Sequence, residues 1–252
     1  MEFTYLDFLA LFGIGGAHPG GLQLTKEILS REKINEKTII LDVGCGTGQT
    51  SAYVAEKYKC KITGLDNNEM MLEKAKKRFQ SRNLPIETRL GSVESLPFGE
   101  ESFDMILSES VATFTDVSKT LPEFRRVLKP NGILLAIEMV LEESLSKEEL
   151  TSIIEFYGVP RIFTESEWSS HLRKANFQQI STEKFNLQPG EPEFENATDF
   201  AISEQLDEEI YDILDQHEQL TNRYRDVLGF RVFRCCVLSS YQSRCFQGAG
   251  AG

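Results

Sequence analysis

The sequence predicts an α/β fold, a doubly wound and mostly parallel sheet of seven strands with helices on both faces. Residues 37–140 alternate short apolar runs with segments of helical period, which is the pattern of βαβ units. The apolar runs lack strict alternation with polar residues, as expected of strands buried on both faces. A chain of 252 residues is long enough for one such domain with a lid or an insertion added.

The first half of the chain is expected to supply five strands and three helices. The strands are predicted at 38–41, 60–65, 86–90, 103–107 and 133–140. One helix follows the first strand, and a second begins after Asn68, whose side chain can cap its first turn. Pro122 is expected in the first turn of a third helix, where its missing N–H costs nothing.

The second half completes the sheet and adds an insertion. Helical signals at 148–157 and 165–176 precede two strands at 177–187 and 230–240. Residues 189–228 are too long for a hairpin loop and contain an acidic helical stretch at 202–220, so they are interpreted as an insertion near the carboxyl ends of the strands. The expected organisation is a single domain with an N-terminal lid at 1–36, a core at 37–140 and a C-terminal part at 141–252.

The composition disfavours several kinds of partner. Lys and Arg number 27 against 39 Asp and Glu, a net charge of −12, which repels nucleic acid and anionic lipid surfaces. The five cysteines show no CxxC spacing, and no targeting segment or bilayer-length apolar stretch is seen. We expect a cytoplasmic protein, a monomer or homodimer, without nucleic-acid binding, stable membrane insertion or a metal site.

A glycine-rich turn follows the first predicted strand. Residues 41–49 read LDVGCGTGQ, and glycines at such a turn let a ligand approach the main chain. The dinucleotide pattern GxGxxG would need its third glycine at the position of Gln49, which weakens the alternative of an NAD(P)-dependent oxidoreductase. Asp66 ends the second predicted strand and can accept hydrogen bonds from both hydroxyls of a ribose. Turn and carboxylate together predict a nucleoside ligand.

Residues 37–137 resemble the Rossmann-like, class I S-adenosylmethionine-dependent methyltransferases, and among them the small-molecule enzymes of the ubiquinone/menaquinone-biosynthesis type. Four motifs carry the resemblance: LDVGCGTG at 41–48, GLDNNEMM at 64–71, GSVESLPF at 91–98 and RRVLKPNGILL at 125–135. The resemblance implies methyl transfer from S-adenosylmethionine to a small, partly apolar metabolite, with S-adenosylhomocysteine as product. A protein that binds the cofactor without catalysis is the alternative.

The same resemblance implies where the methionine part of the cofactor lies. Asp42 would meet its amino group, and the main chain of the turn at Gly44, Cys45, Gly46 and Gly48 would line it. The ammonium and sulfonium groups favour carboxylate neighbours, and the absence of phosphate removes the need for an anion site, so the residues suit this cofactor independently of the family.

The adenosine part is implied to meet the ends of the next two strands. Asp66 would hold the ribose hydroxyls, with Asn67 and Met71 beside the adenosine. The family usually has an acidic residue after the glycine of GSVESLPF, where this chain has Ser92. The contact to the adenine amino group then falls to Ser92 or Glu94, together with the Val93 amide.

Three residues are candidates for a general base, which is needed only if the acceptor loses a proton. His18 lies in a glycine-rich segment that can fold over the cofactor, with a solvated turn as the alternative. Glu109 follows the fourth strand and is either a wall or base of the acceptor pocket, or else a polar loop residue or a cofactor contact. Glu138 lies in an apolar strand, where it is either a functional group or part of a salt bridge. His217, in the acidic insertion, is expected to be solvated.

The aromatic side chains near the N-terminus have two interpretations. Phe3, Tyr5, Phe8 and Phe12 recur at helical spacing. They either line an apolar acceptor pocket as part of a lid or simply pack an amphipathic helix on the domain.

Overall fold

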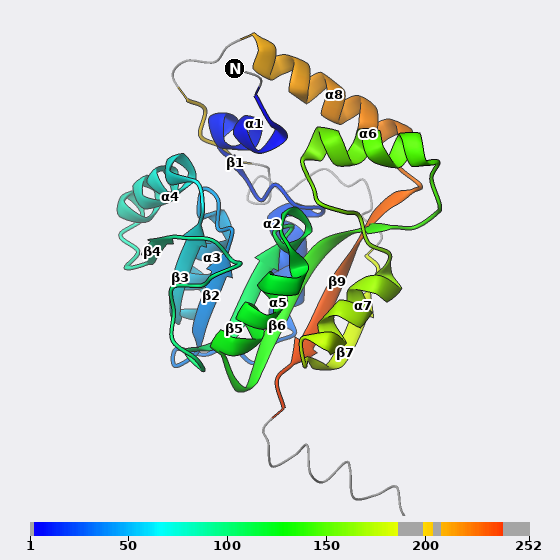
Figure 1. Ribbon diagram of the computed structural model, residues 1–252. Helices are drawn as coiled ribbons and strands as arrows, with labels where there is room; N and C mark the ends of the chain where they lie inside the picture. The colour runs from blue at the N-terminus through cyan, green and yellow to red at the C-terminus, as the bar shows by residue number, and fades with distance from the viewer. Residues whose placement is uncertain (1–2, 186–198, 204–207, 239–252) are drawn as a thin grey trace, which may run out of the picture.

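The computed structural model describes residues 3–185, 199–203 and 208–238. Its centre is a seven-stranded sheet of order β4-β3-β2-β5-β6-β9-β7 (Figure 1). The strands are β2 (Ile39–Val43), β3 (Lys61–Asp66), β4 (Glu87–Leu90), β5 (Phe103–Glu109), β6 (Leu128–Leu141), β7 (Gln178–Glu183) and β9 (Leu228–Cys236). Strand β9 runs antiparallel to β6 and β7, and the other neighbouring pairs are parallel. The predicted sheet is confirmed.

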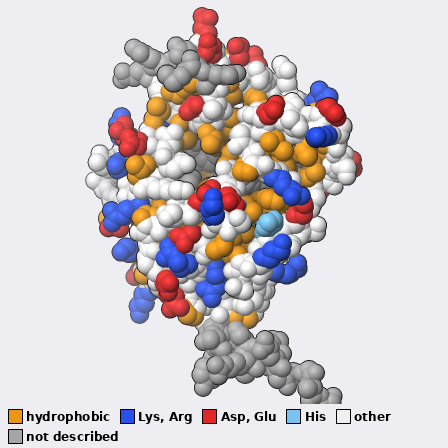
Figure 2. Space-filling model, viewed as in Figure 1, with side chains coloured by type: hydrophobic (Ala, Val, Ile, Leu, Met, Phe, Trp, Pro, Cys, Tyr) orange, Lys and Arg blue, Asp and Glu red, His pale blue; other side chains and the backbone are white. Residues whose placement is uncertain are grey.

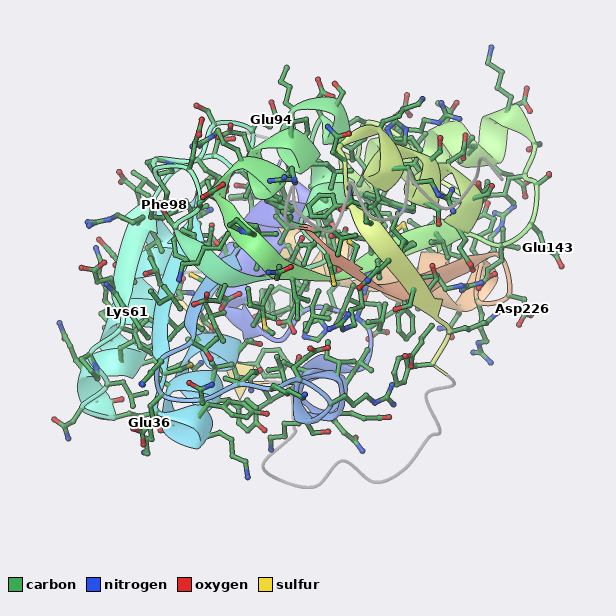
Figure 3. The ribbon with its side chains drawn as sticks, turned by 90° about the horizontal axis from the view of Figure 1, so that it is seen from below. Glu36, Lys61, Glu94, Phe98, Glu143 and Asp226 are labelled. Carbon is green, nitrogen blue, oxygen red and sulfur yellow. The ribbon has the colours of Figure 1, made fainter. Side chains whose placement is uncertain are left out.

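Helices cover both faces of this sheet, as the view from below shows (Figure 3). One face carries α2 (Gly21–Ser30), α3 (Gln49–Tyr58) and α4 (Glu69–Ser81), and the other carries α5 (Val117–Val127) and α7 (Glu165–Lys174). The first face buries Leu29 against Ile40, and the second buries Phe124 and Trp168 in the cluster that contains Leu134. Burial on both faces explains the continuous apolar runs of the strands.

The element boundaries differ from the predicted ones around α5. The helix begins at Val117 because the Asp116 side chain accepts from the Ser118 amide and caps it, so Pro122 lies inside the helix and not in its first turn. Strand β6 begins at Leu128 and includes the predicted turn at 130–132 as an irregularity, with Asn131 at φ 64°. Helix α2 was not predicted, because its start is a glycine pair without a capping side chain.

Four elements form a cap over the carboxyl ends of the central strands (Figure 1). They are α1 (Tyr5–Phe12), β1 (Ile14–Gly15), β8 (Asp199–Phe200) and α8 (Glu209–Arg223), and α6 (Lys147–Tyr157) lies beside them. Strand β1 pairs antiparallel with β8, and α1 packs on α8 around the buried Ile210. The structure therefore joins the predicted N-terminal lid to the helical insertion. The insertion's other residues, 189–198 and 204–207, lie outside the described part.

A lysine of the core holds the cap in place. Lys74 of α4 donates from Nζ to the carbonyl oxygens of Ala10 (2.7 Å) and Leu11 (3.1 Å) at the end of α1. It also donates to Ser203 Oγ (3.1 Å), which follows β8. Within the described ranges, no helix is long and apolar enough to cross a membrane.

Candidate functional site

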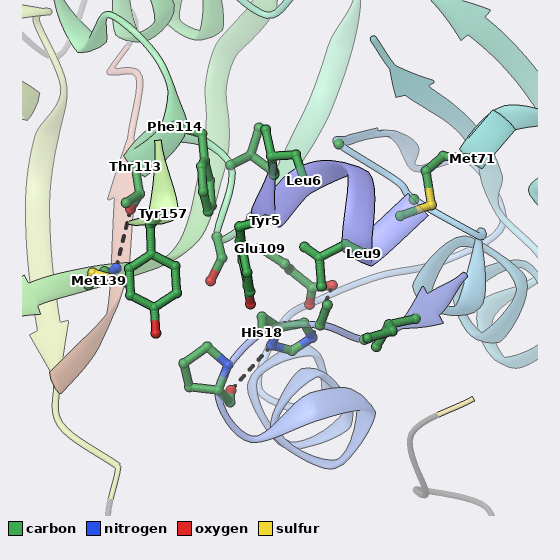
Figure 4. A pocket seen from close by; sticks show the side chains of 18 of the residues that line it. Tyr5, Leu6, Leu9, His18, Met71, Glu109, Thr113, Phe114, Met139 and Tyr157 are labelled. Atoms are coloured by element: carbon green, nitrogen blue, oxygen red, sulfur yellow. Dashed lines mark hydrogen bonds and ion pairs between the residues drawn. The ribbon is translucent and has the colours of Figure 1, made fainter. Parts of the chain in front are cut away.

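A cavity of about 1130 Å³ lies between the cap and the carboxyl ends of the strands (Figure 4). Figure 2 shows hydrophobic side chains gathered on the upper part of the molecule, where the cap meets the sheet. Pockets for one small ligand hold about 300–1,000 Å³, so this cavity has room for a cofactor and an acceptor together. It is lined by these predicted site residues: His18, Asp42, Gly44, Cys45, Gly46, Asp66, Asn67, Met71, Ser92, Val93, Glu94 and Glu109. Gly48 and Glu138 are not part of the lining.

The three glycines of the turn serve different purposes. All have positive φ, at 60° for Gly44, 51° for Gly46 and 77° for Gly48. A Cβ on Gly44 would lie 2.4 Å from Val111 Cγ2, and one on Gly48 would lie 2.4 Å from Phe79 Cζ. A Cβ on Gly46 would meet nothing within 4 Å. Gly44 and Gly48 therefore permit close packing, whereas Gly46 leaves main chain open to the cavity.

Asp66 joins the turn to the end of β3. Its Oδ2 accepts from the Gly46 amide (2.8 Å), and its Oδ1 accepts from the Asn68 amide (2.9 Å). Burial raises the pKa of Asp66, and these backbone hydrogen bonds oppose that shift. Each carboxylate oxygen keeps a further lone pair, so two hydroxyls can still be bound from the cavity side.

Asp42 lies deeper, at the end of β2, where only 2% of it is exposed. Ser51 Oγ donates to its Oδ2 at 2.6 Å. Burial, together with repulsion by Glu109 and Asp66, raises the pKa of Asp42 to about 8. A cation in the cavity would relieve this repulsion, which suits a ligand that carries positive charge.

The residues predicted to contact the adenosine line one part of the cavity, near the ends of β3 and β4. Met71 and Val93 are buried and line the cavity. The Ser92 hydroxyl accepts from the Glu94 amide (3.1 Å). The Glu94 carboxylate accepts from the Asp116 amide (2.9 Å) and lies 3.6 Å from Lys119 Nζ. The Glu94 carboxylate is thus already paired within the protein.

His18 and Glu109 meet in the cavity, although 91 positions separate them in the chain (109 − 18). His18 Nε2 lies 3.4 Å from Glu109 Oε2, and its Nδ1 lies 3.2 Å from the Pro19 carbonyl oxygen. Thr25 donates to Glu109 Oε1 (2.6 Å) and Thr50 donates to Oε2 (2.7 Å). Thr25 Oγ1 also lies 3.2 Å from His18 Nε2, so each ring nitrogen of His18 has a hydrogen-bonding partner at the edge of the cavity.

Glu138 has a different position. Its Oε1 accepts from Ser108 Oγ (2.9 Å) and the Ala112 amide (3.2 Å), and its Oε2 accepts from the amide (2.9 Å) and hydroxyl (2.7 Å) of Thr113. Burial raises its pKa, and these hydrogen bonds oppose the shift. The carboxylate holds the turn that carries Phe114 into the cavity. The partners are amides and hydroxyls, not the cation of a salt bridge.

The cap adds residues that were not predicted as site residues. Tyr157 OH lies 3.1 Å from His217 Nδ1, and both residues line the cavity with Tyr5 and Phe114. His217 is half-buried against Tyr157, and not fully solvated as expected; this burial lowers the pKa of its imidazole. These residues come from four separate elements, and periodicity alone gives no sign that they meet. Tyr5, Phe8 and Phe12 line the cavity, whereas Phe3 does not; all four pack together in the cluster around α1.

Comparison with known proteins identifies the family. A family model described as "Methyltransferase domain" matches residues 41–136. The Bacillus subtilis protein named "Uncharacterized methyltransferase YodH" is 42% identical over 229 residues, which are 91% of this chain and 97% of that protein. The glycine/sarcosine/dimethylglycine N-methyltransferase of Actinopolyspora halophila is 30% identical over 60% of this chain and 27% of its own length.

The fold is shared with a solved methyltransferase. Phosphoethanolamine N-methyltransferase 2 of Haemonchus contortus, in complex with S-adenosyl-L-methionine, superposes with a TM-score of 0.76 at 19% identity. The match covers 95% of this chain and 58% of that protein. The family model, the Bacillus subtilis relative and the shared fold together show an S-adenosylmethionine-dependent methyltransferase. The chain belongs to the class I S-adenosylmethionine-dependent methyltransferases.

Proposed function

We propose that the cavity binds S-adenosylmethionine along the turn after β2 and a small, partly apolar acceptor beneath the cap. The observation that carries this proposal is the open main chain at Gly46, whose amide is bonded to Asp66 at 2.8 Å. Together they supply a surface for close approach and a carboxylate for ribose hydroxyls, side by side.

The surrounding residues fit the remaining parts of the cofactor. Asp42 and Glu109 lie near enough to repel each other, and an ammonium group between them would be stabilised by both. Met71 and Val93 give the adenine apolar contact, and the Ser92 hydroxyl gives it a polar one. When bound, the cofactor supplies a methyl group already activated by sulfonium charge.

The protein's contribution to the reaction is alignment and exclusion of water. The cap closes the cavity from above, and the rings of Tyr5 and Phe114 border the space where the acceptor would lie (Figure 4). We assign His18 to holding Glu109 and the segment before α2, since its Nε2 faces Glu109 and Thr25 and its Nδ1 faces the Pro19 carbonyl. We assign Glu138 to positioning the turn at 112–114.

We further propose that the enzyme acts in the cytoplasm, as a monomer or homodimer, on a metabolite and not on nucleic acid. Cys45, Cys60, Cys235 and Cys236 are free and buried, which suits a reducing compartment. The net charge of −12 and the shape of the site, a cavity under a cap, both favour a small acceptor over a polymer.

Calorimetry with S-adenosylhomocysteine tests the cofactor site. Asp66→Ala should weaken binding by about 1–3 kcal/mol through lost hydrogen bonds to a charged acceptor. Asp104→Asn is the matched control, since Asp104 also accepts a backbone amide (Ile39, 2.8 Å) but lies at the opposite end of the sheet. We expect this control to lower stability and leave affinity unchanged. Equal affinities of Asp66→Ala and the wild type would remove Asp66 from the site.

A further inference from the structure

The part of the cavity beneath the cap has walls of aromatic rings. We call it the acceptor chamber and define it by Tyr5, Phe114, Tyr157 and His217, all of which line the cavity. Figure 4 shows Tyr5, Phe114 and Tyr157 facing a common space above Glu109 and His18. The chamber therefore lies on the side of the cofactor turn that is closed by α1, α6 and α8.

The rings are held in fixed orientations by contact with one another. The ring centroid of Tyr5 lies 4.9 Å from that of Tyr157, with the two rings edge to face. It lies 6.4 Å from the ring centroid of Phe114, with an angle of 11° between the two ring planes. The His217 ring lies 5.2 Å from Tyr5. Ring faces carry negative partial charge, so several rings around one space attract a cation placed among them.

The ionisable side chains that define the chamber carry no positive charge that would repel a bound cation. Burial raises the pKa of Tyr5 and of Tyr157 and lowers the pKa of His217, so all three are neutral at pH 7. Among the described residues that line the whole cavity, the carboxylates are Asp42, Asp66, Glu94, Glu109 and Glu218. Arg225 is the single lysine or arginine in that set, and its side chain is exposed at the end of the cap. An anionic acceptor would find little to bind here.

We propose that the methyl acceptor of this enzyme is an amine carried on a partly apolar molecule, and that the rings of the acceptor chamber bind the ammonium form of its product. This inference rests on the proposed seating of the cofactor below the chamber. The neutral amine nitrogen takes the methyl group from sulfur: the N–C bond forms, the C–S bond breaks, and its electron pair stays on sulfur. The positive charge thereby passes to nitrogen, inside the chamber.

The fate of the proton depends on the amine. A tertiary amine becomes a quaternary ammonium and releases no proton. A primary or secondary amine releases one proton from nitrogen after transfer, and the neutral imidazole of His217, beside Tyr157 OH, is a group able to take it. Positive charge develops on the nitrogen only as the methyl group is transferred. Rings that stabilise this charge therefore favour the transition state over the neutral substrate.

A pair of probes that differ only in charge tests this inference. Choline carries a trimethylammonium group, and 3,3-dimethyl-1-butanol has the same shape with carbon in place of nitrogen. Binding of S-adenosylhomocysteine to the full chain is measured first by calorimetry. Each probe is then titrated into the chain saturated with S-adenosylhomocysteine. We expect choline to bind about tenfold more tightly than the uncharged alcohol, as for a desolvated cation among aromatic faces.

Three variants assign that preference to the chamber. Tyr5→Phe keeps the ring and should keep the preference, whereas Tyr5→Leu should reduce it to less than about threefold. Phe156→Leu is the matched control, because Phe156 belongs to the same ring cluster but does not line the cavity, and it should keep the preference. Equal binding of the two probes to the wild type, or an unchanged ratio in Tyr5→Leu, overturns the inference. Failure of the wild type to bind S-adenosylhomocysteine would instead contradict the proposed cofactor site.

Discussion

The glycines of the turn after β2 offer a prediction in which packing and ligand binding can be separated. Both Gly46 and Gly48 have positive φ, so alanine at either position costs about 1–2 kcal/mol of backbone strain. At Gly48 the new methyl group would also lie 2.4 Å from the Phe79 ring, and overpacking of this kind costs about 1–3 kcal/mol more. At Gly46 it would point into the cavity and meet nothing within 4 Å.

Gly48→Ala should therefore lose more stability than Gly46→Ala, whereas Gly46→Ala should lose more affinity for the ligand. Gly48→Ala should lower the free energy of unfolding by about 2–5 kcal/mol and Gly46→Ala by only about 1–2 kcal/mol. A loss of 1 kcal/mol lowers the melting temperature by roughly 2–4 °C in a chain of this size. Gly46→Ala should weaken S-adenosylhomocysteine binding by about tenfold or more, because its methyl group takes up ligand space.

The assay is urea unfolding of each ligand-free variant, followed by calorimetry at a temperature where both are folded. Gly48→Ala should bind the product within about threefold of the wild type, a difference under about 1 kcal/mol. The reasoning is refuted if Gly46→Ala binds as tightly as the wild type, since Gly46 would then not face the ligand. It is also refuted if Gly46→Ala unfolds as readily as Gly48→Ala.

Other residues give independent predictions. Glu138→Gln should cost about 1–3 kcal/mol of unfolding free energy, because the new amide group faces the Ala112 or Thr113 N–H; an unchanged urea midpoint would contradict this. The folded protein holds the Asp42 proton up to a pH of about 8, and the unfolded chain releases it near 3.8, so stability falls as pH rises between these values. Asp42→Asn lacks this titration, and its melting temperature relative to the wild type should rise from pH 4 to pH 8; a constant difference would contradict the raised pKa of Asp42. Protease should cleave α1 faster in Lys74→Met than in the control Lys76→Met, whose side chain is exposed in the wild type. Equal cleavage rates would show that Lys74 does not hold the cap in place.

The sequence could predict the core of the fold because its signals are local. Apolar runs at 38–41 and 60–65, the glycine turn between them and Asp66 lie within 30 residues of one another, and the structure brings them together as β2, β3 and the cofactor edge. The ends of helices and strands are harder to predict where two local signals compete. At α5 the Asp116 cap overrides Pro122, which sits inside the helix.

The sequence predicts a lid and an insertion separately, but not that they pack together or that their rings form the acceptor chamber. Tyr5, Phe114, Tyr157 and His217 come from α1, the turn after β5, α6 and α8, and only the closed tertiary structure brings their rings together. The roles of polar residues were likewise ambiguous, since a carboxylate such as Glu138 looks the same in the sequence whether it faces a cavity or a set of backbone amides.

A crystal structure of the chain with S-adenosylhomocysteine tests the cofactor site most directly. We expect the ribose hydroxyls on the Asp66 carboxylate, the methionine part against Gly46, and the sulfur facing the space between Tyr5 and Phe114. Product bound elsewhere, or in this cavity with Asp66 contacting neither hydroxyl, would contradict the proposed site.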